Sequence, residues 1–299
     1  MKVFTVWVGR NMRLFFKDKG MFFTALITPL ILLVLYTTFL GGIYRDTFEA
    51  ALAPAGLPVS EDLLNGAVGG QLTSSLLAVC CVTVAFCSNM LSVQDKANGT
   101  LRDLTVSPMR PGLMALGYYV ATLLTTLLIC LCAAGACLIY MRATGWYLSG
   151  ADVWLILADV CLLTVFGTAL SGLINFFLSS QGQISAVGTI VSAGYGFICG
   201  AYMPISSFSE GLQRVISFLP GTYGTSLLRN HALGGVFREL TALGFPQEAV
   251  DGLRDAMDCQ LYFFDTAVPI WGMYAVLGGF AAVVLAAYVL LMRFGRARV

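Results

Sequence analysis

The residue of this sequence with the clearest chemical potential is Asp159, a lone carboxylate inside a long apolar stretch, residues 153–178. An ionisable side chain in such a stretch can bind a proton or a cation, or it can pair with a polar group inside the protein. Arg142 and a neighbouring chain are the partners expected for such a pair. His231, the only histidine, is expected at the surface, because no second ligand or nucleophile accompanies it. Transport and structural roles for Asp159 both stay open.

The other reactive residue types form no catalytic or metal-binding pattern. The nine cysteines lack a Cys-x-x-Cys pair and stand at Cys80, Cys81, Cys87, Cys130, Cys132, Cys137, Cys161, Cys199 and Cys259. Eight of them lie in apolar stretches, so we expect small apolar packing residues. No Gly-Lys dipeptide occurs, which excludes the P-loop that cradles nucleotide phosphates. We therefore predict no metal site, no cofactor and no enzymatic activity in this chain.

The composition excludes a soluble enzyme. Of 299 residues, 58% are apolar and only 11% are charged, and the mean hydropathy is +0.82. Soluble domains carry about 25% charged residues, because they need a hydrated shell. The net charge of +1 gives no reason to expect a nucleic-acid partner. The chain is therefore predicted to be an integral membrane protein.

Six apolar stretches are long enough to cross a bilayer, which takes about 20 helical residues. They are residues 21–44, 71–93, 112–141, 153–178, 183–205 and 267–292. Within them Asp159 is the only acidic or basic residue. A lipid-embedded backbone must satisfy its own hydrogen bonds, and no alternating strand pattern is present, so these stretches are expected to be helices. The predicted fold class is an all-α integral membrane protein, with residues 1–299 as a single transmembrane domain.

Basic residues are distributed unevenly between the segments that connect the spans. The first set holds 11 of the 17 Lys and Arg and three acids, and comprises residues 1–20, 94–111, 179–182 and 293–299. The other set holds six Arg and 12 acids, and comprises residues 45–70, 142–152 and 206–266. The positive-inside rule then places both termini in the cytoplasm. The outer segment 206–266 is expected to hold short helices near the outer surface, at 208–218, 222–234 and 247–260.

Residues 1–20 are predicted to form an amphipathic helix in the inner headgroup layer. At 100° per residue, one face carries apolar side chains, those of Phe4, Trp7, Val8, Leu14 and Phe15. The opposite face carries the basic side chains of Lys2, Arg10, Arg13 and Lys17. Such a division suits a helix that lies in the membrane surface, with Trp7, Arg10, Arg13 and Lys17 as its interfacial residues.

The loop 94–111 is predicted to contain a short cytoplasmic helix with defined ends. Thr100 can act as N-cap, Asp103 can complete a capping box, and Gly99 permits a sharp turn before it. Pro108 ends the helix, because the residue before a proline disfavours helical backbone. A helix of two turns is unstable alone in water, so its apolar face, with Leu101 and Leu104, must pack on something. The candidates are the ends of the protein's own spans or a soluble partner.

This loop resembles the coupling-helix segment of the ABC-2 family of ABC-transporter permeases. The residues that carry the resemblance are Asp95, Gly99, Thr100, Leu101, Leu104, Ser107, Pro108, Met109 and Arg110. Residues 200–204, 218–223 and 227–229 also resemble the family, as does the plan of an amphipathic helix followed by six spans. Gln94 departs from the pattern, because many members have an acid there, and Asp95 is the nearest substitute.

The resemblance implies the membrane-spanning permease of an ABC exporter of the multidrug or antibiotic-efflux type, in a bacterial-type plasma membrane. Such permeases act as dimers, with a second copy or a paralogue, and dock ABC ATPase subunits that bind ATP and Mg²⁺. The residues implied in coupling to the ATPase are Asp95, Gly99, Thr100, Leu101, Arg102, Asp103, Leu104, Pro108 and Arg110. The cytoplasmic segments are too short to fold a nucleotide-binding domain, so the ATPase must be another chain.

The second and fifth spans carry polar residues, and the resemblance favours these spans as walls of a transport cavity. The expected lining residues are Ser75, Thr83, Asn89, Ser185, Thr189, Ser192 and Tyr195. Interhelical hydrogen bonds explain any one of them equally well. A cavity almost without charge suits an apolar or amphipathic cargo, such as a drug, an antibiotic or a lipid, moved by alternating access.

Two further functions remain as alternatives. The first is a secondary transporter or channel that needs no ATPase and uses Asp159 as its ion site, although inverted repeats are not evident. The second is a membrane-bound scaffold or enzyme that acts through the outer segment 206–266. That segment shows no recognisable catalytic set, so the last alternative ranks lowest.

Overall fold

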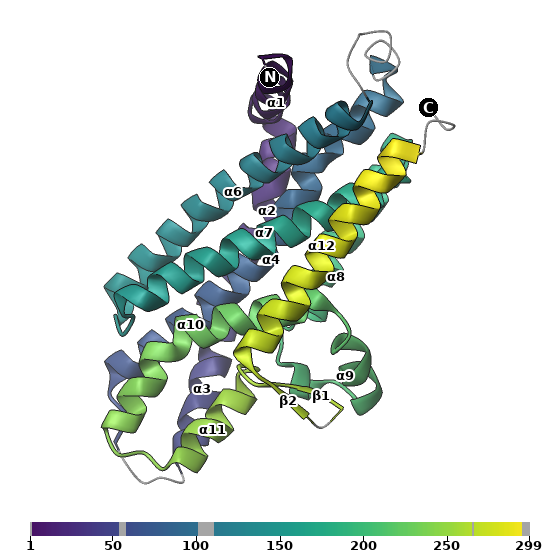
Figure 1. The fold of residues 1–299 in the computed structure, drawn as a ribbon. Helices are drawn as coiled ribbons and strands as arrows, with labels where there is room; N and C mark the ends of the chain where they lie inside the picture. Colours follow the sequence, from purple (N-terminus) through teal and green to yellow (C-terminus); the bar gives the residue numbers. More distant parts are fainter. Residues whose placement is uncertain (1, 54–57, 101–110, 265, 295–299) are drawn as a thin grey trace.

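The computed structural model of this chain describes residues 2–53, 58–100, 111–264 and 266–294. These residues form an all-α integral membrane protein with one small two-stranded sheet (Figure 1). The elements are α1 Lys2–Lys17, α2 Lys19–Leu35, the π-helix η1 Tyr36–Leu40, α3 Gly41–Leu52, α4 Glu61–Ala97, α6 Pro111–Thr144, α7 Gly150–Phe176, α8 Gln181–Ile198, the 3-10 helix η3 Ile205–Ser207, α9 Glu210–Ile216, α10 Pro220–Ala242, α11 Gln247–Ala256, β1 Leu261–Phe263, β2 Thr266–Val268 and α12 Ile270–Phe294.

Helix α4 is the centre of the bundle, and it packs against α2, α6, α7, α8 and α10. Its charged residues stand only at its two ends, and its middle turns are buried throughout. Small residues let neighbours approach closely. A Cβ atom on Gly70 would lie 2.8 Å from the carbonyl oxygen of Ala232 in α10. The sequence places glycine where the two backbones nearly touch.

The end of α12 lies at the same end of the bundle as α1 (Figure 1). Helix α4 also ends there and α6 begins there, so both ends of the loop 98–110 emerge beside α1. Helices α9, α10 and α11 and the β1–β2 hairpin gather toward the opposite end (Figure 1). For the described residues, we call the end with α1 the terminal end of the bundle. The opposite end, with α9, α11 and the hairpin, is the distal end.

Five helical segments of the described chain are long and apolar enough to cross a membrane: Lys19–Leu52, Glu61–Ala97, Gly112–Thr144, Gly150–Phe176 and Ile270–Met292. The predicted fifth span, 183–205, is occupied by α8, which is shorter and ends at Ile198. Gly200 has a φ of +74°, which permits the chain to turn sharply after that end. Polar residues at the start of α8, including Gln181 and Gln183, make it less apolar than the five. The count of six spans therefore stays a prediction.

The outer segment 206–266 differs from its prediction. Helix α10 includes the predicted stretch 222–234 but runs for 23 residues, and it packs between α4, α7 and α12 rather than at the surface. The expectation of a short helix there is wrong, and the polar side chains of α10 find partners inside the protein. Helices α9 and α11 are short, as expected. The antiparallel pair β1–β2, with Leu261 opposite Val268, was not predicted.

Candidate functional site

Asp95 joins three helices at the terminal end of the bundle. It stands in the last turn of α4 and is almost fully buried. Its Oδ2 lies 2.9 Å from Nη1 of Arg10 in α1 and accepts a hydrogen bond of 2.6 Å from the Tyr118 hydroxyl in α6. A carboxylate that accepts from a guanidinium and a phenol is held more strongly than in a neutral hydrogen bond. We call Asp95, Arg10 and Tyr118 the terminal clamp.

Trp7 fixes α1 directly on α6, beside the terminal clamp. Its indole Nε1 donates to the carbonyl oxygen of Met114 at 3.3 Å, and its ring meets that of Tyr118 edge to face, with centroids 5.3 Å apart. The Arg10 guanidinium lies 4.9 Å from the centroid of the indole, in a cation–π contact. Helix α1 is therefore bound to the bundle by specific side-chain contacts.

The predicted faces of α1 are only partly correct. Trp7, Val8 and Phe15 are buried in the protein, and Arg13 and Lys17 are exposed. Arg10 was expected on the basic face with Lys2, Arg13 and Lys17, but its guanidinium turns inward to Asp95. The partner lies 85 residues away in the sequence, so helical periodicity within residues 1–20 could not show it.

Lys96 holds the same end of α4 to a fourth helix. Its Nζ donates to the carbonyl oxygens of Asn175 at 3.3 Å and Phe176 at 3.0 Å, in the last turn of α7. The ammonium also lies 5.4 Å from the centroid of the Phe176 ring. A cation at the C-terminal carbonyls satisfies acceptors that have no partner within the helix. The sequence analysis did not predict the contact between Lys96 and α7. The only feature of the sequence that could have indicated it is the adjacent pair Asp95-Lys96 at the end of a predicted span.

The loop with the resemblance to a coupling helix starts at this fixed end. Helix α4 ends at Ala97, and Gly99 has a φ of +78°, so the chain turns there as predicted. Thr100 follows directly. The other residues predicted to couple to an ATPase lie outside the described residues, namely Leu101, Arg102, Asp103, Leu104, Pro108 and Arg110. The loop thus connects the end of α4 to the start of α6.

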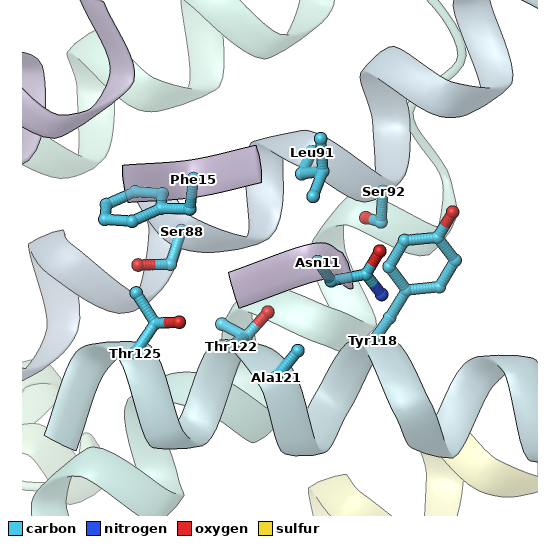
Figure 2. A pocket seen from close by; sticks show the side chains of 9 residues that line it. All are labelled: Asn11, Phe15, Ser88, Leu91, Ser92, Tyr118, Ala121, Thr122 and Thr125. Carbon is cyan, nitrogen blue, oxygen red and sulfur yellow. The ribbon is translucent and has the colours of Figure 1, made fainter. Parts of the chain in front are cut away.

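A cavity of about 10 Å³ lies behind the terminal clamp, between α1, α4 and α6 (Figure 2). Its lining residues are Asn11, Phe15, Ser88, Leu91, Ser92, Tyr118, Ala121, Thr122 and Thr125. Asn11 Nδ2 and Ser88 Oγ have no hydrogen-bond partner among the described residues. The cavity matches the volume of one water molecule, and polar atoms on two walls suit it for one. The interface between α1 and the bundle therefore has room for one water molecule between the polar atoms of its walls.

A much larger cleft, of about 1010 Å³, opens between α2 with η1 on one side and α8 on the other, with α4 at its floor. Three of the predicted lining residues border it: Ser185, Thr189 and Ser192 of α8. They form a row of hydroxyls that faces Thr24, Thr28 and apolar side chains of α2. Asp18 is the only acidic or basic side chain among the described lining residues. The sequence analysis missed the wall made by α2 and η1.

The other four predicted lining residues lie elsewhere in the protein. Ser75 accepts a hydrogen bond of 2.8 Å from the Tyr36 hydroxyl, and Thr83 donates to the Val79 carbonyl oxygen of its own helix. Asn89 donates to Ser171 Oγ at 3.3 Å, and Tyr195 is buried beside Gly221. Helix α4 borders the cleft instead through Cys87, Met90 and Gln94. Its polar residues thus mainly serve packing between helices.

Asp159 and His231 form one buried cluster, which corrects two predictions. Asp159 does not pair with Arg142, whose guanidinium lies 5.9 Å from the centroid of the Trp146 ring. Its carboxylate instead contacts His231 Nδ1 and the Tyr274 hydroxyl. His231 is not a surface residue, because α10 is packed inside the bundle. The sequence separated the two residues by 72 positions and offered no signal for their contact.

A second buried charge pair holds the distal end together. Arg229 of α10 is 1% exposed, and its Nη1 lies 2.9 Å from Asp258 Oδ2. Its Nη2 donates to the carbonyl oxygen of Gly200, and Asp258 Oδ2 accepts from the backbone N–H of Ile205 at 2.9 Å. Burial raises the pKa of the Asp258 carboxyl, against the opposing charge of Arg229. We call Arg229 and Asp258 the distal pair.

Comparison with known proteins agrees with this architecture. The sequence model of the ABC-2 type transporter family matches residues 2–232, which include α1, the terminal clamp, the walls of the cleft and most of α10. No curated protein gives a significant match to the chain. The matched range includes both described ends of the loop 98–110.

Proposed function

This chain belongs to the ABC-2 type transporter family, and on that premise we propose that it is the permease subunit of an ATP-driven exporter. Members of the family are transmembrane components of ABC transporters, which associate with an ABC ATPase. The ATPase subunits would be separate chains that bind ATP and Mg²⁺ on the cytoplasmic face. The observation that carries the proposal is the terminal clamp, which joins the end of α4, where the loop 98–110 begins, to α1 and α6.

In this proposal, the loop 98–110 receives the motion of the ATPase, and the terminal clamp distributes it. A displacement of the loop pulls on the last turn of α4, where Asp95 holds α1 and α6 and Lys96 holds α7. Four helices then move together instead of one. Binding of ATP would shift the populations of inward-open and outward-open states by stabilising one arrangement of these helices.

The cleft between α2 and α8 is the proposed route of the cargo. Its volume suits a drug-sized molecule, and both walls combine hydroxyl and apolar side chains. With a single ionisable side chain on its described walls, a strongly charged cargo would lack countercharges. We therefore propose an apolar or amphipathic cargo, such as a drug, an antibiotic or a lipid. A second permease, a copy or a paralogue, would close the open side of the cleft.

The substitution Leu104→Asp tests this function, because it places a charge on the predicted apolar face of the loop helix. We expect the variant to insert into the membrane normally but to lose the co-purifying ATPase and all ATP-dependent transport. Leu243→Asp is the matched control, since Leu243 is exposed at the far end of α10, remote from the loop.

Mild-detergent purification and mass spectrometry measure the partner, and vesicle transport measures the activity. Full transport by Leu104→Asp with the ATPase still bound would overturn the coupling assignment. A wild-type preparation that transports a solute without any P-loop protein would favour the alternative, a secondary transporter or channel that uses Asp159.

A further inference from the structure

A cluster of three polar side chains joins α7, α10 and α12 in the distal half of the bundle. Asp159 Oδ2 lies 2.6 Å from His231 Nδ1, and Asp159 Oδ1 accepts a hydrogen bond of 2.5 Å from the Tyr274 hydroxyl. Asp159 is 1% exposed, and the rings of His231 and Tyr274 are stacked with centroids 6.3 Å apart. Each helix contributes one side chain, so the cluster is the polar junction of these helices.

The charges around the cluster are already engaged elsewhere. On α7, Asp152 is paired with Arg238 of α10, two turns from the cluster. On α10, Arg229 is directed to Asp258. From α4, the Cys81 thiol donates to the carbonyl oxygen of Val160, next to Asp159. Within the described residues, no Lys or Arg forms an ion pair with Asp159, and Tyr274 is the titratable contact from α12.

A proton is the countercharge that the cluster can take up on its own side chains. A neutral imidazole that donates Nδ1–H to Asp159 leaves a net charge of −1 in a buried place, which is costly. A second proton, taken up on Nε2, turns the imidazole into a cation beside the carboxylate and brings the net charge to zero. Histidine is the side chain that makes this change between about pH 5 and 8.

We propose that Asp159, His231 and Tyr274 form a proton-binding site whose occupancy sets how firmly α10 is held between α7 and α12. With the proton bound, the attraction between imidazolium and carboxylate holds α10 to α7. Without it, an uncompensated buried charge weakens the junction. The proton is thus a ligand of the permease in its own right, and this role is independent of the ATPase.

The chain has a single histidine, which permits a direct measurement. Full-length protein labelled with ¹⁵N and ¹³C histidine, in nanodiscs, gives one imidazole signal that can be followed from pH 5 to 9. We expect the chemical shifts of the wild-type imidazole to change across this pH range, as the ring takes up its second proton. In Asp159→Asn the carboxylate charge is lost, so the change should occur at a lower pH than in the wild type.

Tyr274→Phe gives a test of opposite sign. It removes a donor that stabilises the bare carboxylate, so the unprotonated cluster becomes less stable and the signal should change at a higher pH than in the wild type. General damage to the fold would shift both variants in the same direction. Asp152→Asn is the matched control on α7, because its carboxylate contacts Ser149 and Arg238 but not His231, and it should leave the signal unchanged.

Hydrogen exchange of α10 tests the mechanical part of the proposal. After correction for the intrinsic effect of pH, protection of residues 220–242 should be greater at low pH, with a change of up to about tenfold per pH unit. This dependence should disappear in Asp159→Asn. The proposal is overturned if the wild-type imidazole signal is constant from pH 5 to 9, if Asp159→Asn changes at the wild-type pH, or if protection of α10 has the same pH dependence in both.

Discussion

The two ends of the bundle use charge in different ways. At the terminal end, Asp95 is buried but Arg10 keeps a third of its side chain exposed. At the distal end, both partners of the Arg229–Asp258 pair are buried. A half-exposed pair keeps much of its hydration and can form and break at low cost, whereas a buried pair can be broken only by leaving a charge without water. The comparison suggests an adjustable terminal end and a rigid distal end.

The largest expected effect comes from breaking the distal pair. Asp258→Ala leaves the Arg229 guanidinium buried without its carboxylate, and we expect a loss of about 3–5 kcal/mol in the free energy of unfolding. Asp95→Ala, the matched change at the terminal end, should cost less, about 2 kcal/mol, because Arg10 can turn to water and only the buried Tyr118 hydroxyl loses its acceptor. Denaturant titration of the purified protein in detergent measures both.

The double variant Arg229→Met/Asp258→Leu sharpens that comparison. It removes both charges and keeps apolar volume, so it should regain most of the stability that Asp258→Ala loses. If Asp95→Ala is as destabilising as Asp258→Ala, the difference between the two ends is not a matter of burial and the comparison fails.

The sequence could predict features that depend on neighbouring residues, but not those that depend on distant ones. Five of the six apolar stretches, the helix at residues 2–17 and the turn at Gly99 follow from local composition and spacing, and the structure agrees with them. The turn into the loop 98–110 needs only a glycine and the end of a helix. Such patterns lie within one or two turns of the chain and are visible without a fold.

Helix α10 shows why the rest could not be predicted. Arg229, Asn230 and His231 stand together in a segment with several acids, which is typical of a water-exposed surface. In the structure they are buried, because Asp258, the carbonyl oxygen of Cys259 and Asp159 satisfy them. Those partners lie 29 to 72 residues away, so the polarity of the segment alone indicates the wrong environment. The same holds at the terminal end, where Arg10 finds its partner Asp95 85 residues away in the sequence.

Glycine-to-alanine substitutions are expected to give the next largest loss in the free energy of unfolding. They compare the two ends of the bundle by adding a Cβ atom where helices pack closely. A Cβ atom at Gly70 would meet the backbone carbonyl of Ala232, which cannot move without α10. At Gly117 it would collide with the indole of Trp7, on the separate helix α1. We expect Gly70→Ala to cost about 3 kcal/mol and Gly117→Ala about 1 kcal/mol in the free energy of unfolding, because the second obstacle can shift.

Gly135→Ala is the control for both changes, since nothing lies within 4 Å of its added Cβ atom and alanine favours helix. It should be neutral or slightly stabilising in the same denaturant titration. Tryptophan fluorescence gives a second measurement, because only Gly117→Ala should alter the environment of Trp7. Equal losses for Gly70→Ala and Gly117→Ala would show that α1 is held as rigidly as α10.

The smallest effect is expected for the ion pair on the rim of the distal end. Arg238 pairs with Asp152, but its side chain is 57% exposed. Asp152 also accepts from the backbone N–H and hydroxyl of Ser149, both at 2.8 Å, as part of the N-cap of α7. Arg238→Ala should therefore cost at most about 1 kcal/mol and lose even that at high salt. Because Arg229 of the distal pair lies on the same helix as Arg238, a large and salt-independent loss in Arg238→Ala would mean that position on α10, rather than burial, makes the distal end rigid.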